Sequence, residues 1–467
     1  MTSLSALQLL TLSIGTACCM SPAWGQLQNT QQPSIKLSDL ANGVVLRLAD
    51  QKGDATPTDQ PDVHPTLSMA ELVRHGLQHS PQLRQAKAQR EAASHAQKVS
   101  QADLLPSFSL RFATGPESSQ SSGASSDQHR QQVSTLRLTQ PLYNESLKND
   151  WQSSKHNETA AQRRLQSATD SVVLSVVRAT IDLSAARLVQ DFSNVQLAQL
   201  QNILDYLDTR AAAGASSASD LERAKSRVFT ARQTRMEQQA AYRNAINELQ
   251  RLTQQDPRAI RLPAIDDLPA IQAQGQPIKD MALQRNPDIL AAQMDVDAQQ
   301  AKVNAEWSKY KPVIGLSLEY DDSRNVRGIN GPGKDIRLLV VANWAISLAG
   351  KERHLAEQAM AELRQKEAKL EDEKQRLLQA VDGDTTLFES AAFRVETAQL
   401  EQEAAGKVIT AIEAQLTSGR LGSLLDALDA SERFFASRQR LVQAIAQNLK
   451  AHAQLLARIG QLGDLQP

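Results

Sequence analysis

The stretch NESLKNDWQSSKHNETAAQRRLQSATDSVVLSVVRATIDLSAARLVQDFSNVQLAQLQNILDYLDTRAAAG, residues 144–214, decides the fold. It contains no proline, and its only glycine is Gly214, so its composition stays helical over about 65 residues. At 1.5 Å per residue such a helix is roughly 100 Å long, whereas helices of globular domains have about 10–14 residues. A second stretch of this kind occupies residues 351–416. Two rods of this length cannot belong to a compact domain with a single core.

The composition and charge of the 467-residue chain exclude several classes of protein. Aromatic residues make up only 4%, which suits long helices better than a β-sandwich or an α/β enzyme. The net charge of −1, from 51 basic and 52 acidic residues, gives no indication of a nucleic-acid partner. No apolar run of about 18 residues follows the N-terminus, so a helical membrane span is not expected. Membrane-spanning β-strands are not excluded, because each such strand has only a weak hydrophobic signal in the sequence.

Residues 1–25 have the pattern of a secretory signal peptide. An apolar centre is followed by Ala23-Trp24-Gly25, whose small residues fit signal-peptidase cleavage, although the segment lacks the usual Lys or Arg. The alternative is an ordinary apolar N-terminal helix. Cys18 and Cys19 both lie in this segment, so the mature chain is expected to have no disulfide and no cysteine ligand or nucleophile. Residues 26–65, with four prolines, are expected to form a flexible extension.

The chain repeats one order of elements twice. Each copy begins with a short helix that ends at a polar residue followed by proline, Ser80-Pro81 in the first copy and Asn286-Pro287 in the second. Each continues with a polar helix, a strand, a loop, a strand, a long helix, a glycine-containing tip and a returning helix. After residues 1–25, we therefore divide the chain into five parts: the N-terminal extension (26–65), a first repeat (66–252), an equatorial linker (253–276), a second repeat (277–460) and a tail (461–467).

Four segments alternate apolar and polar residues, as β-strands do. Their apolar positions face one way, and positions such as Arg111 and Arg337 face the other. The apolar positions are Phe108, Leu110 and Phe112; Leu136, Leu138 and Leu142; Ile314, Leu316, Leu318 and Tyr320; and Ile336, Leu338, Val340, Ala342, Trp344, Ile346 and Leu348. At about 9–13 residues each, these segments have the length of membrane-spanning strands. The alternative is a soluble sheet packed against the helices.

In each copy the two strands are joined by a segment rich in Gly, Ser, Asp and Asn, residues 114–130 and 321–334, which is expected to be an external loop. Four strands cannot close a barrel, and a sheet with open edges is not tolerated in lipid. Three chains sharing one barrel would supply about twelve strands. The sequence therefore predicts a mainly α fold with a small β part: long antiparallel helical hairpins, and four strands per chain that contribute to a barrel shared by several chains.

These elements, in this duplicated order, resemble the TolC-type outer-membrane factor family over residues 66–460. The resemblance rests on short motifs: Thr66-Leu67-Ser68-Met69-Ala70-Glu71, Ser80-Pro81, Leu105-Pro106-Ser107, Asn286-Pro287-Asp288 and the tip Ser418-Gly419-Arg420-Leu421-Gly422-Ser423-Leu424-Leu425-Asp426-Ala427-Leu428-Asp429-Ala430. It implies a homotrimeric channel in the cell outer membrane, in contact with outer-membrane lipid. In such a trimer, the helical hairpins form a long periplasmic tunnel and the strands form a shared 12-stranded barrel. It also implies docking onto a periplasmic adaptor (membrane fusion) protein and an inner-membrane ABC exporter or another pump. No enzymatic activity is implied.

Three stretches resemble the type I secretion branch of this family, which exports large proteins. They are residues 213–224, residues 325–331 and residues 423–432. The resemblance implies an exported protein as the cargo. Drug or metal efflux, with a small-molecule cargo, remains the alternative.

Asp426 and Asp429 are candidates for the periplasmic pore entrance. They lie three residues apart on one helix face and match a motif whose aspartates ring the entrance in the family. In a trimer, these carboxylates would surround a narrow axis, raise one another's pKa and favour cations over anions. The alternative is helix capping, because Ser423 followed by Asp426 has the S-x-x-D pattern and acidic residues are favoured at a helix N-terminus.

Gly214, Gly419 and Gly422 mark the two helical tips, where a positive φ is expected. The resemblance makes these tips the contact with the adaptor. Arg210 and Arg420 beside them are candidates for polar contacts between helices that hold the entrance closed. An exposed, solvated arginine is the alternative for each.

A periplasmic coiled-coil structural or adaptor protein is the alternative of another class, and it predicts sustained heptads without lipid-facing strands. An enzyme finds no support, because the sequence has no G-x-S-x-G, no H-E-x-x-H, no P-loop and no glycine-rich dinucleotide turn. No catalytic, cofactor-binding or metal-binding residue is predicted. The interpretation is an outer-membrane exit duct that works by passive conduction through a gated tunnel.

Overall fold

The computed structural model of the protein describes residues 68–119, 127–213, 217–256, 268–269, 271, 276–326, 329–345, 347, 349–417 and 424–462. The expected signal peptide, the N-terminal extension, most of the linker and both glycine-containing tips lie outside these residues. Within the described ranges, no helix is both long and apolar enough to cross a membrane.

The two predicted rods are confirmed as helices α4 (Glu145–Ala212, 68 residues) and α8 (Lys351–Thr417, 67 residues). Helix α4 begins where the side-chain oxygen of Asn144 accepts a hydrogen bond from the backbone N–H of Leu147, at 3.1 Å. This cap satisfies one of the free N–H groups of the first turn. Apolar residues at helical spacing then give α4 a buried stripe, which includes Val172, Val173, Val176, Val177 and Ile181.

The duplicated order is also confirmed. Helices α2 (Met69–His79) and α3 (Pro81–Ala102), strands β1 (Ser107–Ser119) and β2 (Asp127–Tyr143), and helices α4 and α5 (Ala218–Thr253) form one copy. The second copy runs through α6 (Gln276–Arg285), α7 (Pro287–Ser308), β3 (Val313–Val326), β4 (Ile329–Asn343), α8 and α9 (Leu424–Arg458). The two X-Pro motifs are the junctions between the short and the longer helix. Ser80 and Asn286 cap α3 and α7, whose first residue is the proline.

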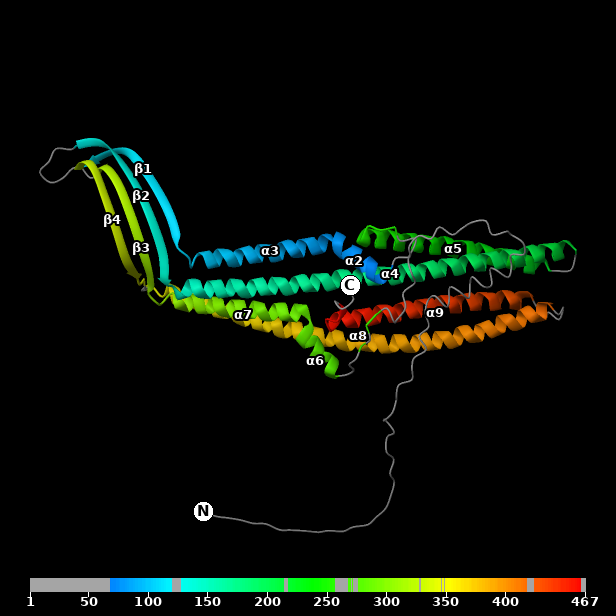
Figure 1. Ribbon diagram of the computed structural model, residues 1–467. Helices are drawn as coiled ribbons and strands as arrows, with labels where there is room; N and C mark the ends of the chain where they lie inside the picture. The colour runs from blue at the N-terminus through cyan, green and yellow to red at the C-terminus, as the bar shows by residue number, and fades with distance from the viewer. Residues whose placement is uncertain are drawn as a thin grey trace, which may run out of the picture. The chain divides into compact units, whose positions relative to one another are not determined.

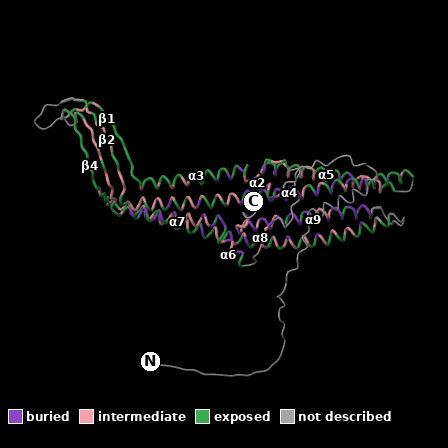
Figure 2. The backbone as a smooth tube through the Cα atoms, in the orientation of Figure 1, coloured by how far each residue is buried: buried purple, intermediate pink, exposed green. Residues whose placement is uncertain are grey.

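Helices α4 and α8 each run alongside two sets of partners (Figure 1). Nearer the sheet, neighbouring helices follow the order α3, α4, α7, α8, whereas nearer the tips they follow the order α5, α4, α9, α8. Figure 2 shows buried segments along α4 and α9, whereas α5 is mostly exposed or intermediate. The core therefore lies between the two repeats, along the contacts of α4 with α7 and α9.

The four strands form one antiparallel sheet in the order β1-β2-β3-β4. They are longer than predicted, at 13 to 17 residues, because the two hairpins extend into the segments expected to be loops. Strand β1 pairs with β2 as far as Ser119 and Asp127, and β3 pairs with β4 as far as Val326 and Ile329. Backbone pairing needs no apolar alternation, so polar residues can extend a hairpin beyond its apolar part.

The predicted end of the last strand was wrong. Strand β4 ends at Asn343, so Trp344 does not belong to the ladder, and Ile346 and Leu348 lie outside the described residues. The indole Nε1 of Trp344 instead donates to the backbone carbonyl of Tyr310, at 2.9 Å. This hydrogen bond ties the end of β4 to the segment that leads from α7 into β3.

Candidate functional site

One face of the sheet is apolar. Register aligns Phe108, Leu138, Leu318 and Leu338 in a row across all four strands. The two outer members of this row, Phe108 and Leu338, are 68% and 65% exposed, although large apolar side chains are usually buried in water-soluble sheets. A contiguous exposed apolar face indicates contact with lipid or with another protein.

The opposite face of the sheet carries charged residues in alternation. Arg137 stands opposite Glu319 across β2 and β3, with Nη2 of the arginine 3.1 Å from Oε1 of the glutamate. Arg337 on β4 pairs with both Glu319 and Asp321, and Asp321 also accepts a hydrogen bond from the Thr135 hydroxyl at 2.7 Å. A face of this kind can line a hydrated passage, because its charged side chains form ion pairs with one another and remain in contact with water.

The sheet meets the helices at a second polar cluster, centred on Glu145 at the start of α4. Its carboxylate accepts hydrogen bonds from Lys311 Nζ at 2.6 Å and from the Tyr143 hydroxyl at 2.8 Å. These bonds, the one from Lys311 first, hold the pKa of Glu145 below its usual value. The carboxylate therefore stays ionised where the chain passes from strand to helix.

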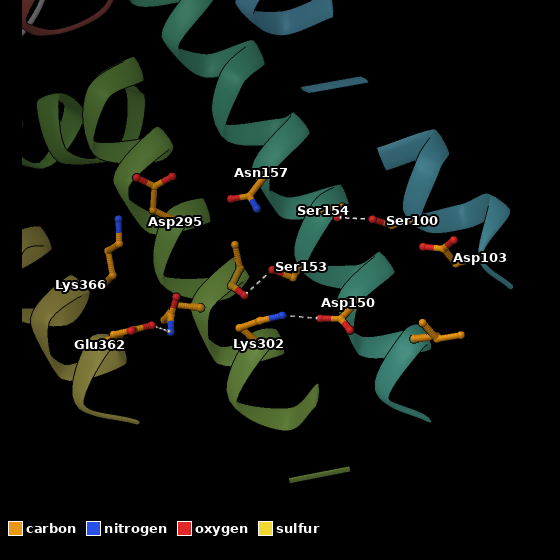
Figure 3. Close-up of a pocket in the computed structure, with 13 residues that line it drawn as sticks. Ser100, Asp103, Asp150, Ser153, Ser154, Asn157, Asp295, Lys302, Glu362 and Lys366 are labelled. Carbon is orange, nitrogen blue, oxygen red and sulfur yellow. Dashed lines mark hydrogen bonds and ion pairs between the residues drawn. The ribbon is translucent and has the colours of Figure 1, made fainter. Parts of the chain in front are cut away.

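A polar groove of about 610 Å³ lies among α3, α4, α7 and α8 (Figure 3). Three hydrogen bonds join α4 to its neighbours in this groove. Lys302 Nζ donates to Asp150 at 2.8 Å and Ser153 Oγ donates to the carbonyl of Ala298 at 2.8 Å, which connects α4 to α7, and the hydroxyls of Ser154 and Ser100 lie 2.8 Å apart, which connects α4 to α3. The charged lining of the groove consists of Asp103, Asp150, Asp295, Glu362, Lys302 and Lys366. Two of the four acidic side chains are already paired, Asp150 with Lys302 and Asp295 with Arg164, so the groove is polar and suits water better than apolar molecules.

The candidate entrance aspartates lie at the start of α9. Asp426 is exposed in the first turn of this helix, where the helix dipole favours an acidic side chain. Asp429, one turn later, forms an ion pair with Arg227 of α5, with Nη2 and Oδ1 2.6 Å apart. Arg227 also contacts the carboxylate of Glu432. The arginine thus ties the returning helix of one repeat to the returning helix of the other.

Sequence reasoning missed Arg227 and Glu432. Among the arginines that it named, Arg210 contacts Tyr206 one turn earlier in its own helix: its guanidinium lies 5.8 Å from the ring centre of Tyr206, and Nη1 is 3.5 Å from the Tyr206 hydroxyl. Arg420 and the glycines Gly214, Gly419 and Gly422 lie outside the described residues. Nothing in the sequence could have found Arg227, because its partners are about 200 residues away and no pattern links them.

A buried histidine fixes the linker to the helices. The ring of His452 on α9 packs 5.2 Å from the ring of Phe388, and its Nε2 donates to the carbonyl of Pro269 at 2.9 Å. Burial lowers the pKa of His452 below its usual value, so the ring is neutral near pH 7. This contact positions the linker and offers no ligand chemistry: in the described part of the chain, no group of three or more His, Cys, Asp or Glu side chains could hold a metal ion.

Comparison with known proteins shows what this arrangement is similar to. The profile of the family described as outer membrane efflux protein matches residues 72–254 and 279–461, one match in each repeat. The chain is 25% identical to outer membrane protein OprJ of Pseudomonas aeruginosa over 330 residues, which cover 68% of this chain and 65% of OprJ. It is 24% identical to protein CyaE of Bordetella pertussis over 428 residues, which cover 87% of this chain and 86% of CyaE.

Solved structures share the fold. The structure of CusC, described for its folding and transmembrane channel formation, superposes with a TM-score of 0.74 at 18% identity and covers 88% of this chain and 98% of that chain. The outer-membrane channel OprN superposes with a TM-score of 0.73 at 21% identity and covers 85% of this chain and 91% of OprN. Since the family profile matches most of both repeats, the chain belongs to the outer membrane efflux protein family and is a channel protein of the outer membrane.

Proposed function

We propose that the chain is the outer-membrane exit duct of a tripartite export system. Three copies form a shared 12-stranded barrel, and their helical hairpins form a gated periplasmic tunnel. The tunnel docks through its tips onto a periplasmic adaptor protein, which connects it to an inner-membrane ABC exporter or another pump. Cargo crosses the duct by passive conduction, since the energy is supplied in the inner membrane.

The sheet is the observation that carries this proposal. Strands β1 and β4 are its two edges, and one of its faces exposes Phe108, Leu110, Ile336, Leu338 and Val340. An isolated sheet of this kind would aggregate, and lipid does not tolerate its free edges. Closure with two further copies satisfies the edges and places the apolar face against lipid. The coiled-coil alternative predicts no such strands.

We infer that the cargo is an exported protein of a type I secretion system. The support is the sequence resemblance of residues 213–224, 325–331 and 423–432 to that branch. Drug or metal efflux is the competing assignment. Deletion of the gene is expected to abolish surface display of a large exported protein and to leave sensitivity to small toxic compounds unchanged. The reverse pattern would assign the duct to efflux.

Conduction tests the duct directly. Purified protein in planar lipid bilayers is expected to form small, cation-selective channels, because Asp426 and Asp429 place carboxylates at the entrance. The double variant Asp426→Ala/Asp429→Ala is expected to lose most of this selectivity. The matched control is Asp220→Ala/Glu222→Ala, which removes two acidic residues from the first turns of α5 and is expected to keep it. Failure to insert into bilayers would overturn the duct, and equal selectivity in both variants would return the aspartates to helix capping.

A further inference from the structure

The apolar face of the sheet gives way to charged residues at the end away from the helices. On this face, side chains lie in rows that cross the strands, two residues apart along each strand. From the row of Phe108 outward, the next three rows across β1, β2, β3 and β4 are Leu110, Leu136, Tyr320 and Ile336; Phe112, Ser134, Asp322 and Lys334; and Thr114, Gln132, Arg324 and Pro332. The face therefore changes from apolar to polar between neighbouring rows.

Three basic side chains lie in this polar part, and we call them the basic patch: Lys334 on β4, Arg324 on β3 and Arg130 on β2. Arg130 is one row further out, opposite Pro116, and its Nε donates to the Thr114 hydroxyl at 3.4 Å, which places its side chain on the same face. All three basic residues are exposed. Each step from one to the next crosses one strand and one row, so neighbouring Cα atoms are about 8 Å apart. Side chains as long as those of Arg and Lys can span this distance to contact one shared anion.

The basic patch differs from the opposite face of the sheet in how its charges are satisfied. On the opposite face, Arg137 and Arg337 pair with carboxylates of β3. Within the ranges that the structure describes, no cation of the basic patch forms an ion pair, and this includes Lys334, although Asp322 stands opposite to it in the register. Three basic residues and one acidic residue give this part of the face a net charge of +2. Its cations are therefore available to an external anion.

The height of the basic patch matches the outer boundary of a membrane. Lys334 lies nine residues from Asn343, the end of β4 next to the helices. At 3.3 Å per residue and a strand tilt of about 40°, this separation corresponds to about 23 Å of height, close to the apolar band of about 25 Å in outer-membrane barrels. Aromatic residues border such a band. Phe112 and Tyr320 stand at its outer border, and Trp344, which is 66% exposed, stands at the other.

We propose that the basic patch binds the phosphate groups of an anionic lipid in the outer leaflet of the membrane. The inference rests on the duct proposed above, which places the apolar face in lipid and the helices in the periplasm. Arginine guanidinium groups donate two hydrogen bonds to a phosphate, and a lysine adds a compact positive charge. The acyl chains of the same lipid lie against Leu110, Phe112 and Ile336, which are 65–74% exposed directly below the patch. The ligand class is thus a phosphorylated lipid, held by its headgroup and its chains together.

Binding of lipid A, a diphosphorylated glycolipid, tests this site. Bound lipid is counted by native mass spectrometry of the detergent-solubilised protein at rising lipid concentration. Arg130→Gln/Arg324→Gln/Lys334→Gln is expected to bind lipid A about 100-fold more weakly, because each basic side chain near an anionic lipid contributes about fivefold. Lipid A from which both phosphates have been removed is expected to bind the unaltered protein with a similar loss.

Two further variants control for net charge and for folding. Arg111→Gln/Arg90→Gln/Lys98→Gln removes the same charge from exposed positions on the opposite face of the sheet and on α3, and its affinity for lipid A is expected to stay within about threefold. Arg130→Lys/Arg324→Lys/Lys334→Arg keeps all three charges and is expected to stay within about fivefold. If the triple glutamine variant does not fold, the three single glutamine variants replace it, each with an expected loss of about fivefold.

The outcomes separate the lipid site from the duct, because bilayer conductance is measured on the same preparations. Conducting protein whose glutamine variants bind lipid A as tightly as the unaltered chain would overturn the site and leave the duct intact. Equal binding of phosphorylated and dephosphorylated lipid would also overturn the site, since the face would then contact acyl chains alone. Unaltered protein that neither conducts nor inserts into bilayers would overturn the proposed duct itself.

Discussion

Helices α5 and α9 hold equivalent places in the two repeats, yet their environments differ. Between Ala231 and Leu249, α5 has no buried residue. Over a stretch of similar position, α9 buries Leu441, Val442, Ala444, Ile445, Ala446 and Leu449. The cause is their place in the layer: α9 packs against both α4 and α8, whereas α5 packs mainly against α4. The two helices also differ in sequence, since α9 has a much stronger apolar stripe and fewer polar residues than α5, so the duplicated positions have diverged into a core helix and an edge helix.

Truncation of a core residue on α9 should produce the largest effect. Leu441→Ala removes a side chain that is 2% exposed and is expected to cost about 2–5 kcal/mol, the range for a leucine whose cavity cannot collapse. The matched change on α5, Met236→Ala, is expected to cost less than about 0.5 kcal/mol within one chain, because Met236 is 62% exposed. Thermal melting of the monomeric protein in detergent, followed by circular dichroism, measures both. Equal losses would contradict the distinction between core and edge.

The helices of the two repeats also show which features of the fold can be predicted from the sequence. Unbroken helical composition located α4 and α8, and a polar residue before proline located the junctions at Ser80 and Asn286, because each signal acts within one or two helical turns. The stronger apolar stripe of α9 indicates a buried helix, and the more polar α5 indicates an exposed one. The helices against which each of them packs could not be predicted in this way, because those contacts join residues far apart in the chain.

The sheet gives a similar lesson. The apolar row of the sheet was predicted from the alternation of residues, but the length of the strands was not. Residues 114–130 and 321–334 resemble loops in composition, and the described residues among them are held largely by pairing with a partner strand. Asn325 illustrates the reason. It adopts a positive φ of 52°, and its side-chain oxygen accepts from the N–H of Gly331 at 2.9 Å. Asn325 belongs to residues 325–331, which resemble the type I secretion branch, but its side chain also stabilises the turn between β3 and β4.

The ends of the two helices sharpen the comparison with an intermediate effect. The backbone adopts a left-handed conformation after the C-terminal end of each helix, at Gln254 (φ 56°) after α5 and at Gly460 (φ 68°) after α9. A Cβ at position 460 would lie 2.9 Å from the carbonyl oxygen of Arg285. Gly460→Ala is therefore expected to cost about 1–3 kcal/mol, from the left-handed conformation and the close contact. Gln254→Gly should raise stability by about 0.5 kcal/mol, because it relieves the same conformation without a contact. The two substitutions should shift the melting temperature in opposite directions, and a lower melting temperature for both would contradict this explanation.

Arg227 joins the edge helix to the core helix, and its removal should have the smallest effect on stability. Its side chain is 38% exposed and those of Asp429 and Glu432 are 51% and 53% exposed, so solvent screens both ion pairs. Arg227→Ala is expected to change the free energy of unfolding by about 0.2–1 kcal/mol.

Its effect on conduction should be much larger than its effect on stability. Within the described residues, this arginine connects α5 to α9 near the tips, so its loss frees the two hairpins to separate at the proposed entrance. Single-channel recordings are expected to show a higher open conductance for Arg227→Ala. Arg235→Ala is the matched control, because Arg235 lies on the same helix but bonds to Asn194 of α4, inside its own hairpin, at 3.0 Å. If both variants conduct alike, the contact between the repeats is a surface ion pair without influence on the entrance. If only Arg227→Ala opens the channel, the ion pairs of Arg227 hold the entrance in addition to the buried apolar contact of Val228 with Leu428.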